Sequence, residues 1–125
     1  MVDMANVAYY PRIYDLAHRF FEESWEDMCD VSYPMMINEM RIGFPVVEIS
    51  SKFHHPLRYG DIIQAKIWIS KVGVKSVTWQ YEFRNQNDIL LWSSTQVTVC
   101  VSMDNMESLP IPEALLPGLR NSKEE

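Results

Sequence analysis

The feature that most constrains the fold is a change of period, from one helical segment to a series of strands. Residues 13–28 contain neither glycine nor proline, and Pro11 suits the first turn of a helix. From Val46 onward apolar residues alternate with polar ones, which is typical of half-buried strands. The chain is therefore predicted to be an α+β protein with one long helix before its strands.

The predicted helix has more apolar surface than one buried face needs. One stripe comprises Ile13, Leu16, Ala17, Phe20 and Met28, and a second comprises Tyr14, His18, Phe21 and Trp25. A helix that is apolar on two sides is expected to be enclosed by a sheet and also to contact a ligand or a partner.

Four strands are predicted over residues 46–54, 61–71, 76–84 and 89–103, with Gly73 in a hairpin loop. Residues 30–45 are expected to form a loop with one helical turn, and residues 114–116 one or two turns. There is no internal repeat or linker, so residues 1–125 are predicted to form a single domain with a curved sheet around the helix.

Charge and composition exclude several classes of function. A net charge of −6 argues against nucleic acid as a partner. No apolar run is long enough to span a membrane and no signal peptide is recognisable, so a cytoplasmic location is expected. Cys29 and Cys100 are too few for a disulfide scaffold, and both are predicted to be reduced and partly buried.

The charges are unevenly distributed. Residues 1–40 contain two basic and eight acidic residues, whereas residues 50–87 contain six basic and two acidic residues. The basic segment is a candidate for attracting a small anionic ligand. Ordinary lysines on the solvated face of a sheet are the alternative interpretation.

The N-terminal segment places a carboxylate, Asp3, shortly before the helix. The first turn of a helix has unpaired N–H groups and a partial positive charge, so it is able to hold a developing oxyanion. A nearby acid is able to act as a base or nucleophile toward an activated acyl group. No metal or cofactor is required for this chemistry.

The segment from Asp3 to Tyr10 resembles the opening of hotdog-fold acyl-CoA thioesterases of the 4-hydroxybenzoyl-CoA thioesterase type. Three further segments are similar to that family in order and spacing: Phe53 to Asp61, Val72 to Val77, and Leu109 to Pro112. The resemblance covers nearly the whole chain and implies a hotdog fold, in which a curved antiparallel sheet wraps a central helix.

The resemblance also implies roles for particular residues. Asp3 matches the catalytic aspartate, and the backbone N–H of Tyr10 is expected to hold the oxyanion. Lys75 and Ser76, with Lys71 nearby, are expected to bind the phosphates of coenzyme A. Two chains are expected to join edge to edge, each active site using both subunits, as homodimers or tetramers of dimers.

The chain departs from the family pattern at several positions. Only Met1 and Val2 precede Asp3, so the family's first strand is expected to be missing. Either the natural start lies upstream of Met1 or this form has lost an edge strand. Asn6 replaces a glycine and is still compatible with a left-handed backbone. Tyr10 stands where many members have histidine, and His18 stands where many have glutamate, so the acyl preference is left open.

Other polar residues have two interpretations. His18 either takes part in catalysis or is a packed residue with one hydrogen bond. His54 and His55 suggest a metal, but adjacent strand residues point to opposite faces and no third ligand is suitably spaced, so we expect none, with His54 in solvent and His55 half-buried.

Two further features are also open to alternative interpretations. Asp61 is predicted to be a turn residue rather than a catalytic one. Three methionines line either a flexible acyl pocket or the core: Met35, Met36 and Met40.

The sequence therefore predicts a thioester hydrolase acting on a medium-chain or aromatic acyl-CoA. The alternative is a non-catalytic hotdog protein that binds acyl-CoA or serves in assembly. A hotdog dehydratase is less favoured, because only His18 is placed to pair with an acid in the pocket.

Overall fold

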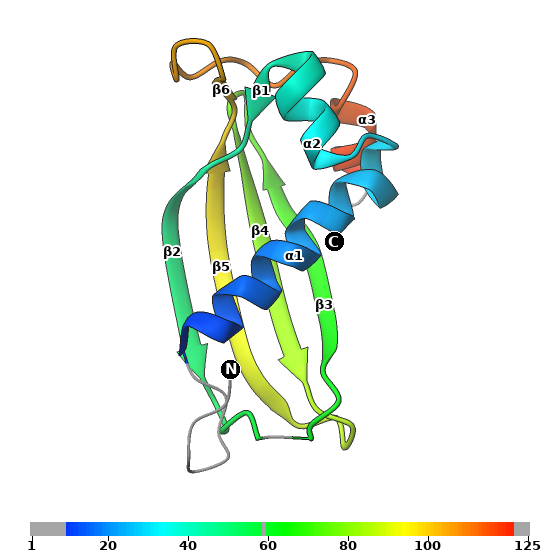
Figure 1. The fold of residues 1–125 in the computed structure, drawn as a ribbon, viewed down its shortest axis with the longest axis vertical. Coiled ribbons are helices and arrows are strands. Elements are labelled where there is room, and N and C mark those ends of the chain that lie inside the picture. The colour runs from blue at the N-terminus through cyan, green and yellow to red at the C-terminus, as the bar shows by residue number, and fades with distance from the viewer. Residues whose placement is uncertain (1–9, 59, 122–125) are drawn as a thin grey trace.

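A long helix, α1 (Tyr10–Cys29), crosses one face of a four-stranded antiparallel sheet (Figure 1). This computed structural model describes residues 10–58 and 60–121, with side chains from Ile13 onward. The predicted helix is confirmed, and it begins at Tyr10, so Pro11 lies in its first turn. In the part of the chain that the structure describes, no helix is long and apolar enough to cross a membrane.

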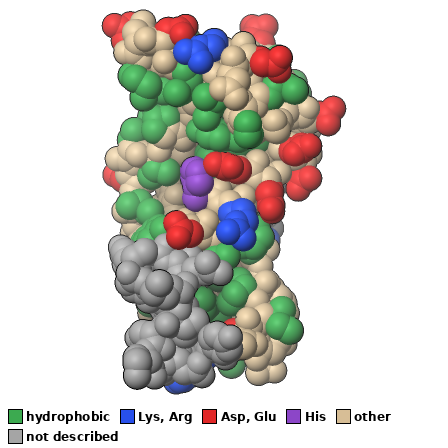
Figure 2. Space-filling model, in the orientation of Figure 1, with side chains coloured by type: hydrophobic (Ala, Val, Ile, Leu, Met, Phe, Trp, Pro, Cys, Tyr) green, Lys and Arg blue, Asp and Glu red, His purple; other side chains and the backbone are tan. Residues whose placement is uncertain are grey.

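The buried ridge of α1 combines residues from both predicted stripes. Every fourth residue faces the sheet and is almost fully buried: Ile13, Ala17, Phe21 and Trp25. The two-stripe prediction was therefore wrong in detail, since His18 is exposed and Leu16 and Phe20 are only partly buried. Acidic side chains gather along the exposed side of the helix (Figure 2).

The sheet consists of β2 (Val46–Phe53), β3 (Gln64–Val72), β4 (Ser76–Arg84) and β5 (Leu90–Val99), in the order β2-β5-β4-β3. The central strand β4 shows the predicted alternation, with every second residue buried. The sheet prediction is confirmed, although β3 begins three residues later than predicted and the last strand is interrupted at Cys100.

The edge strand β2 differs from the predicted alternation of buried apolar and exposed polar residues. Four of its apolar residues are exposed: Val46, Val47, Ile49 and Phe53. A β-bulge between Val46 and Glu48 shifts the alternation, so Val46 and Ile49 border the same cleft. Among the described residues, β2 pairs with β5 on one side and with no strand on the other.

The segment predicted to be mostly loop is more ordered than expected. It forms the short helix α2 (Tyr33–Met35), a π-helical turn η1 (Met36–Met40) and strand β1 (Ile42–Gly43), which pairs with β6 (Val101–Ser102). Ser32 caps α2 by accepting a hydrogen bond from the Met35 N–H at 3.3 Å. Capping by Ser32 and proline in the first turn explain the helical conformation.

The C-terminal helix α3 (Leu116–Asn121) begins later than the predicted turns and packs against the end of α1. Gly118 permits this approach, because a β-carbon there would meet the carbonyl oxygen of Met28 and the thiol of Cys29. Both cysteines are free. Cys29 is partly buried, as predicted, whereas Cys100 is fully buried and so more enclosed than predicted. Burial raises the pKa of the Cys100 thiol to about 11.

Candidate active site

The first turn of α1 lies at one end of the sheet, beside β2 and β5. The Tyr14 ring packs edge-on against Trp92 with centroids 5.7 Å apart, and its hydroxyl donates to Ser51 Oγ at 2.8 Å. Asp3 lies outside the described residues. Tyr10 begins the helix, so its backbone N–H is among those that α1 itself leaves without a partner.

A cleft of about 330 Å³ opens between the first half of α1 and the sheet. Its walls are mainly aromatic, formed by Tyr14, Phe21, Tyr33 and Phe44, while Val46 and Ile49 of β2 close one side. This size falls at the lower end of the range for small-molecule sites, which are usually apolar with a few placed polar groups.

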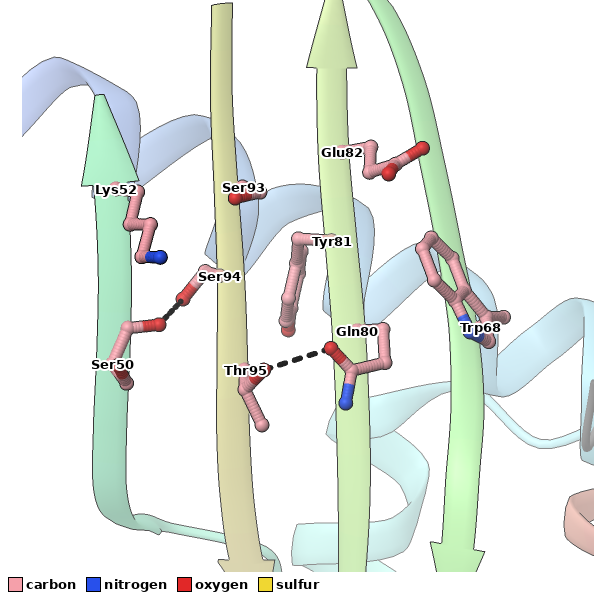
Figure 3. Close-up of a pocket in the computed structure, with 9 residues that line it drawn as sticks. All are labelled: Ser50, Lys52, Trp68, Gln80, Tyr81, Glu82, Ser93, Ser94 and Thr95. Atoms are coloured by element: carbon pink, nitrogen blue, oxygen red, sulfur yellow. Dashed lines mark hydrogen bonds between the residues drawn. The ribbon is translucent and has the colours of Figure 1, made fainter. Parts of the chain in front are cut away.

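The floor of the cleft adjoins a chain of buried polar groups. Ser51 Oγ lies 2.9 Å from Ser94 Oγ, and the Gln96 amide donates to the same Ser94 oxygen at 3.3 Å. Ser94 in turn donates to the Ser50 carbonyl at 3.1 Å, a bond drawn in Figure 3. These bonds fix the orientation of the Gln96 side chain beneath α1.

His18 borders the cleft from the helix. Its side chain is 62% exposed, and its Nε2 lies 2.7 Å from Glu22 Oε2 one turn further along. The imidazole also stacks on Phe21 with ring centroids 5.9 Å apart. His18 is therefore held by an acid and an aromatic ring at a position that faces both cleft and solvent.

The basic residues predicted to bind coenzyme A lie elsewhere in the same chain. Lys71 is near the end of β3, and Lys75 and Ser76 are at the hairpin that joins β3 to β4. The Lys75 ammonium donates to Ser108 Oγ at 3.4 Å. This hairpin lies at the opposite end of the sheet from the first turn of α1 (Figure 1). The structure therefore does not bring the two predicted groups together within one chain.

The two adjacent histidines have hydrogen-bond partners of their own. His54 Nε2 lies 2.9 Å from Ser93 Oγ, and His55 Nδ1 lies 3.1 Å from the Leu90 carbonyl. Both are exposed, so the expectation of a half-buried His55 was wrong. Within residues 10–58 and 60–121 no three His, Cys, Asp or Glu side chains are grouped to hold a metal ion.

Two further predictions have clear outcomes. Asp61 is a turn residue, since its carboxylate accepts a hydrogen bond from the Arg58 N–H at 2.8 Å. Of the three methionines, Met36 is fully buried in the core, Met40 packs partly against it and Met35 is exposed. None of the three lines the cleft.

A second depression, of about 290 Å³, lies on the opposite face of the sheet (Figure 3). It is lined mainly by polar side chains, including Lys52 and Glu82. Some are already paired with one another, since Thr95 Oγ1 donates to Gln80 Oε1 at 2.8 Å. The sheet separates this depression from α1, so the cleft beneath the helix is the better candidate for the site.

Sequence reasoning missed the polar floor of the cleft. The signal was present in β5, where Trp92, Ser94, Gln96 and Thr98 share one face through their spacing of two. Three polar residues follow a tryptophan on a face that must be buried. Such a pattern indicates either an internal hydrogen-bond network or a ligand.

Comparison with known proteins decides the family. Residues 1–119 match the Thioesterase-like superfamily. The chain belongs to the Thioesterase-like superfamily. A curated relative is the 1,4-dihydroxy-2-naphthoyl-CoA hydrolase of Nostoc punctiforme, which is 22% identical over 98% of this chain and 82% of its own.

Solved structures of this superfamily share the fold. A thioesterase superfamily protein from Jannaschia sp. CCS1 superposes with a TM-score of 0.91 at 18% identity, covering 98% of this chain and 85% of its own. The 1,4-dihydroxy-2-naphthoyl-CoA thioesterase of Synechocystis gives 0.85 at 20% identity, covering 96% and 88%. The predicted hotdog fold is confirmed, and the predicted thioesterase is confirmed by the superfamily and its curated CoA thioester hydrolases.

Proposed function

We propose that this thioesterase hydrolyses an aromatic acyl-CoA to the free acid and coenzyme A. The observation that carries the proposal is the aromatic-walled cleft beneath the first half of α1. Rings favour edge-to-face contacts with other rings, so Tyr14, Phe21 and Phe44 suit a flat aromatic group better than a flexible chain. The curated relative's naphthoyl substrate supports the same choice.

Asp3 is the proposed catalyst, and the Tyr10 N–H is the proposed oxyanion donor. As a base, the carboxylate takes a proton from water while the water oxygen attacks the thioester carbon. The tetrahedral oxyanion then collapses and expels the thiolate, which takes up the proton. As a nucleophile, the carboxylate attacks the thioester carbon and expels the coenzyme A thiolate, which leaves a mixed anhydride. Water then hydrolyses the anhydride to the free acid and the regenerated carboxylate, and the thiolate takes up the released proton. A hydrogen-bond donor of this kind typically lowers the activation free energy by about 3 kcal/mol.

His18 is proposed to position the attacking water or a polar part of the substrate. Glu22 fixes one of its ring nitrogens at 2.7 Å, and the imidazole borders the cleft. A histidine oriented by a carboxylate is a common arrangement for proton transfer. In this proposal Asp3 remains the residue that acts on the thioester.

Hydrolysis of a thioester panel tests this function. We expect thiol release from benzoyl-CoA and 2-naphthoyl-CoA in the presence of EDTA, with kcat/KM at least about tenfold above that for octanoyl-CoA, because pocket fit discriminates by 1–3 kcal/mol. Acyl carrier protein thioesters complete the panel. Equal or faster hydrolysis of octanoyl-CoA contradicts the aromatic preference. Binding of acyl-CoA with no thiol release from any substrate supports the non-catalytic alternative.

We also propose that two chains pair through β2. This edge strand exposes Val46, Val47, Ile49 and Phe53, and an uncovered apolar edge favours pairing with another strand. A two-fold axis makes the paired strands antiparallel, so the partner's β3–β4 hairpin comes to the end of the double sheet where α1 of the first chain begins. This arrangement would bring the partner's Lys75 closer to the first turn of α1 than the Lys75 of the same chain lies.

Substitution of Val47 by glutamate tests the pairing. Val47 is 62% exposed on β2, and a carboxylate there would have to be removed from water where the two edge strands meet. We expect sedimentation velocity to show a shift from dimer toward monomer. Val74→Glu is the matched control, because Val74 is 75% exposed at the hairpin. An unchanged dimer in Val47→Glu, or a monomeric unmodified protein, contradicts pairing through β2.

A further inference from the structure

Two polar side chains on the floor of the cleft have unused hydrogen-bonding capacity. Tyr81 is 2% exposed and Gln96 is 5% exposed, and both line the cleft. The Gln96 amide nitrogen donates to Ser94 Oγ at 3.3 Å. Among the described residues, neither Gln96 Oε1 nor the Tyr81 hydroxyl has a hydrogen-bond partner. Among the described residues, the buried side-chain nitrogen and oxygen atoms without a partner are the indole nitrogens of Trp25 and Trp92, so these two oxygens are open to the cleft rather than sealed in the core. They are therefore available to a ligand.

Their neighbours do not satisfy them. Tyr81 lies directly opposite Ser94 in the register of β4 and β5. Ser94 Oγ, however, donates a hydrogen bond to the Ser50 carbonyl and is also hydrogen-bonded to Ser51 Oγ and the Gln96 amide nitrogen. A hydroxyl has one donor and two acceptor positions, so Ser94 is fully used. The Tyr81 hydroxyl is left facing the cleft.

The two groups have complementary chemistry. Burial raises the pKa of Tyr81 well above its ordinary value, so the phenol stays neutral and is able to donate. Gln96 Oε1 accepts. On the sheet they are diagonal neighbours, since Tyr81 pairs with Ser94 and Gln96 is two residues further along β5. Diagonal neighbours on one face have Cα atoms about 7–8 Å apart, so both side chains reach the same part of the cleft.

We propose that Tyr81 and Gln96 are specificity-determining residues that bind a hydroxyl group carried by the acyl moiety. A hydroxyl accepts a bond from Tyr81 and donates one to Gln96 Oε1, so a single substituent satisfies both. A carboxylate has no proton to donate, and an unsubstituted ring leaves both groups unpaired. The inference rests on the proposed function and narrows its substrates to hydroxylated aromatic acyl thioesters.

The test compares benzoyl-CoA with 2-, 3- and 4-hydroxybenzoyl-CoA. We expect the unmodified enzyme to favour at least one hydroxybenzoyl isomer over benzoyl-CoA by about 100-fold in kcat/KM, the equivalent of two buried hydrogen bonds. Tyr81→Phe and Gln96→Leu should each reduce this ratio about tenfold, because each removes one of the two hydrogen bonds to the substrate hydroxyl.

Tyr33→Phe is the matched control. Tyr33 lines the same cleft, but its hydroxyl already accepts a hydrogen bond from the Phe44 N–H at 2.9 Å. We therefore expect it to leave the ratio unchanged. The inference is overturned if the unmodified enzyme does not distinguish the substrates, or if Tyr81→Phe lowers kcat/KM for both equally.

A binding measurement separates this inference from the proposed function. If no acyl-CoA is hydrolysed, the proposed function fails, and titration calorimetry with the hydroxybenzoic acids and benzoic acid then decides the inference. Preferential binding of a hydroxybenzoic acid that is lost in Tyr81→Phe supports it. Equal binding of all the acids, or binding of none, overturns it. Thermal unfolding of each variant establishes that it is folded.

Discussion

Replacing Asp3 by asparagine is expected to lower kcat/KM for the best acyl-CoA by about 10²–10⁴-fold, the usual contribution of a positioned acid or base. The amide keeps the size of the side chain but neither accepts a proton from water nor forms an anhydride with the acyl group. The loss should appear mainly in kcat. Thiol release under saturating substrate, with coenzyme A binding measured separately, checks it.

The control is Asp15→Asn, since Asp15 is an exposed acid on α1. It should retain full activity, which would exclude a general effect of removing one negative charge near the site. If Asp3→Asn hydrolyses the substrate as fast as the unmodified enzyme, Asp3 is not the catalyst. The pair His18 and Glu22 then becomes the alternative source of a base, and Glu22→Gln tests it.

Replacing Trp25 by alanine is expected to reduce the free energy of unfolding by about 3–5 kcal/mol, the usual cost of deleting a buried aromatic side chain. Trp25 is fully buried, and its ring lies 4.6 Å from Phe44 and 5.5 Å from Trp79 between centroids. Its indole nitrogen has no hydrogen-bond partner among the described residues. The loss is therefore one of packing, and urea unfolding measures it.

Trp68→Ala provides the comparison, because it removes the same side chain from a partly exposed position on the other face of the sheet. Lys66 Nζ lies 4.9 Å from that ring, so the substitution also removes a cation–π contact. We expect this substitution to reduce the free energy of unfolding by no more than about 2 kcal/mol, because it removes less buried surface and only one exposed cation–π contact. Equal effects at the two positions would contradict the central place assigned to Trp25.

The hydrophobic period was sufficient to predict the helix and the strands, because burial on one face constrains residues at a fixed spacing. β4 shows this most clearly. It was not sufficient for β2, since a sequence does not reveal which strand lies at an edge or where a bulge such as that after Val46 shifts the alternation. Residues 33–40 were harder because capping by Ser32 stabilises helical turns without a regular apolar pattern.

The candidate site was predictable only where its functional residues lie close together in the sequence. Asp3 and Tyr10 were recognised as neighbours along the chain, and that prediction still needs its test. Tyr81 and Gln96 come from two strands and meet only through the register of the sheet. The β3–β4 hairpin with Lys75 lies away from the first turn of α1 in the same chain. Its basic residues were recognised in the sequence, but the sequence does not reveal at which end of the sheet the hairpin lies.

The contact at Gly118 has a consequence for how the chain reaches its final state. The backbone of Gly118 packs closely against the carbonyl of Met28. The neighbouring Cys29 thiol donates a hydrogen bond to the Leu115 carbonyl at 3.6 Å. These partners are separated by most of the printed sequence, and contacts of such long range form slowly. During synthesis on the ribosome, the end of α1 must therefore wait until α3 has emerged before it gains this cover.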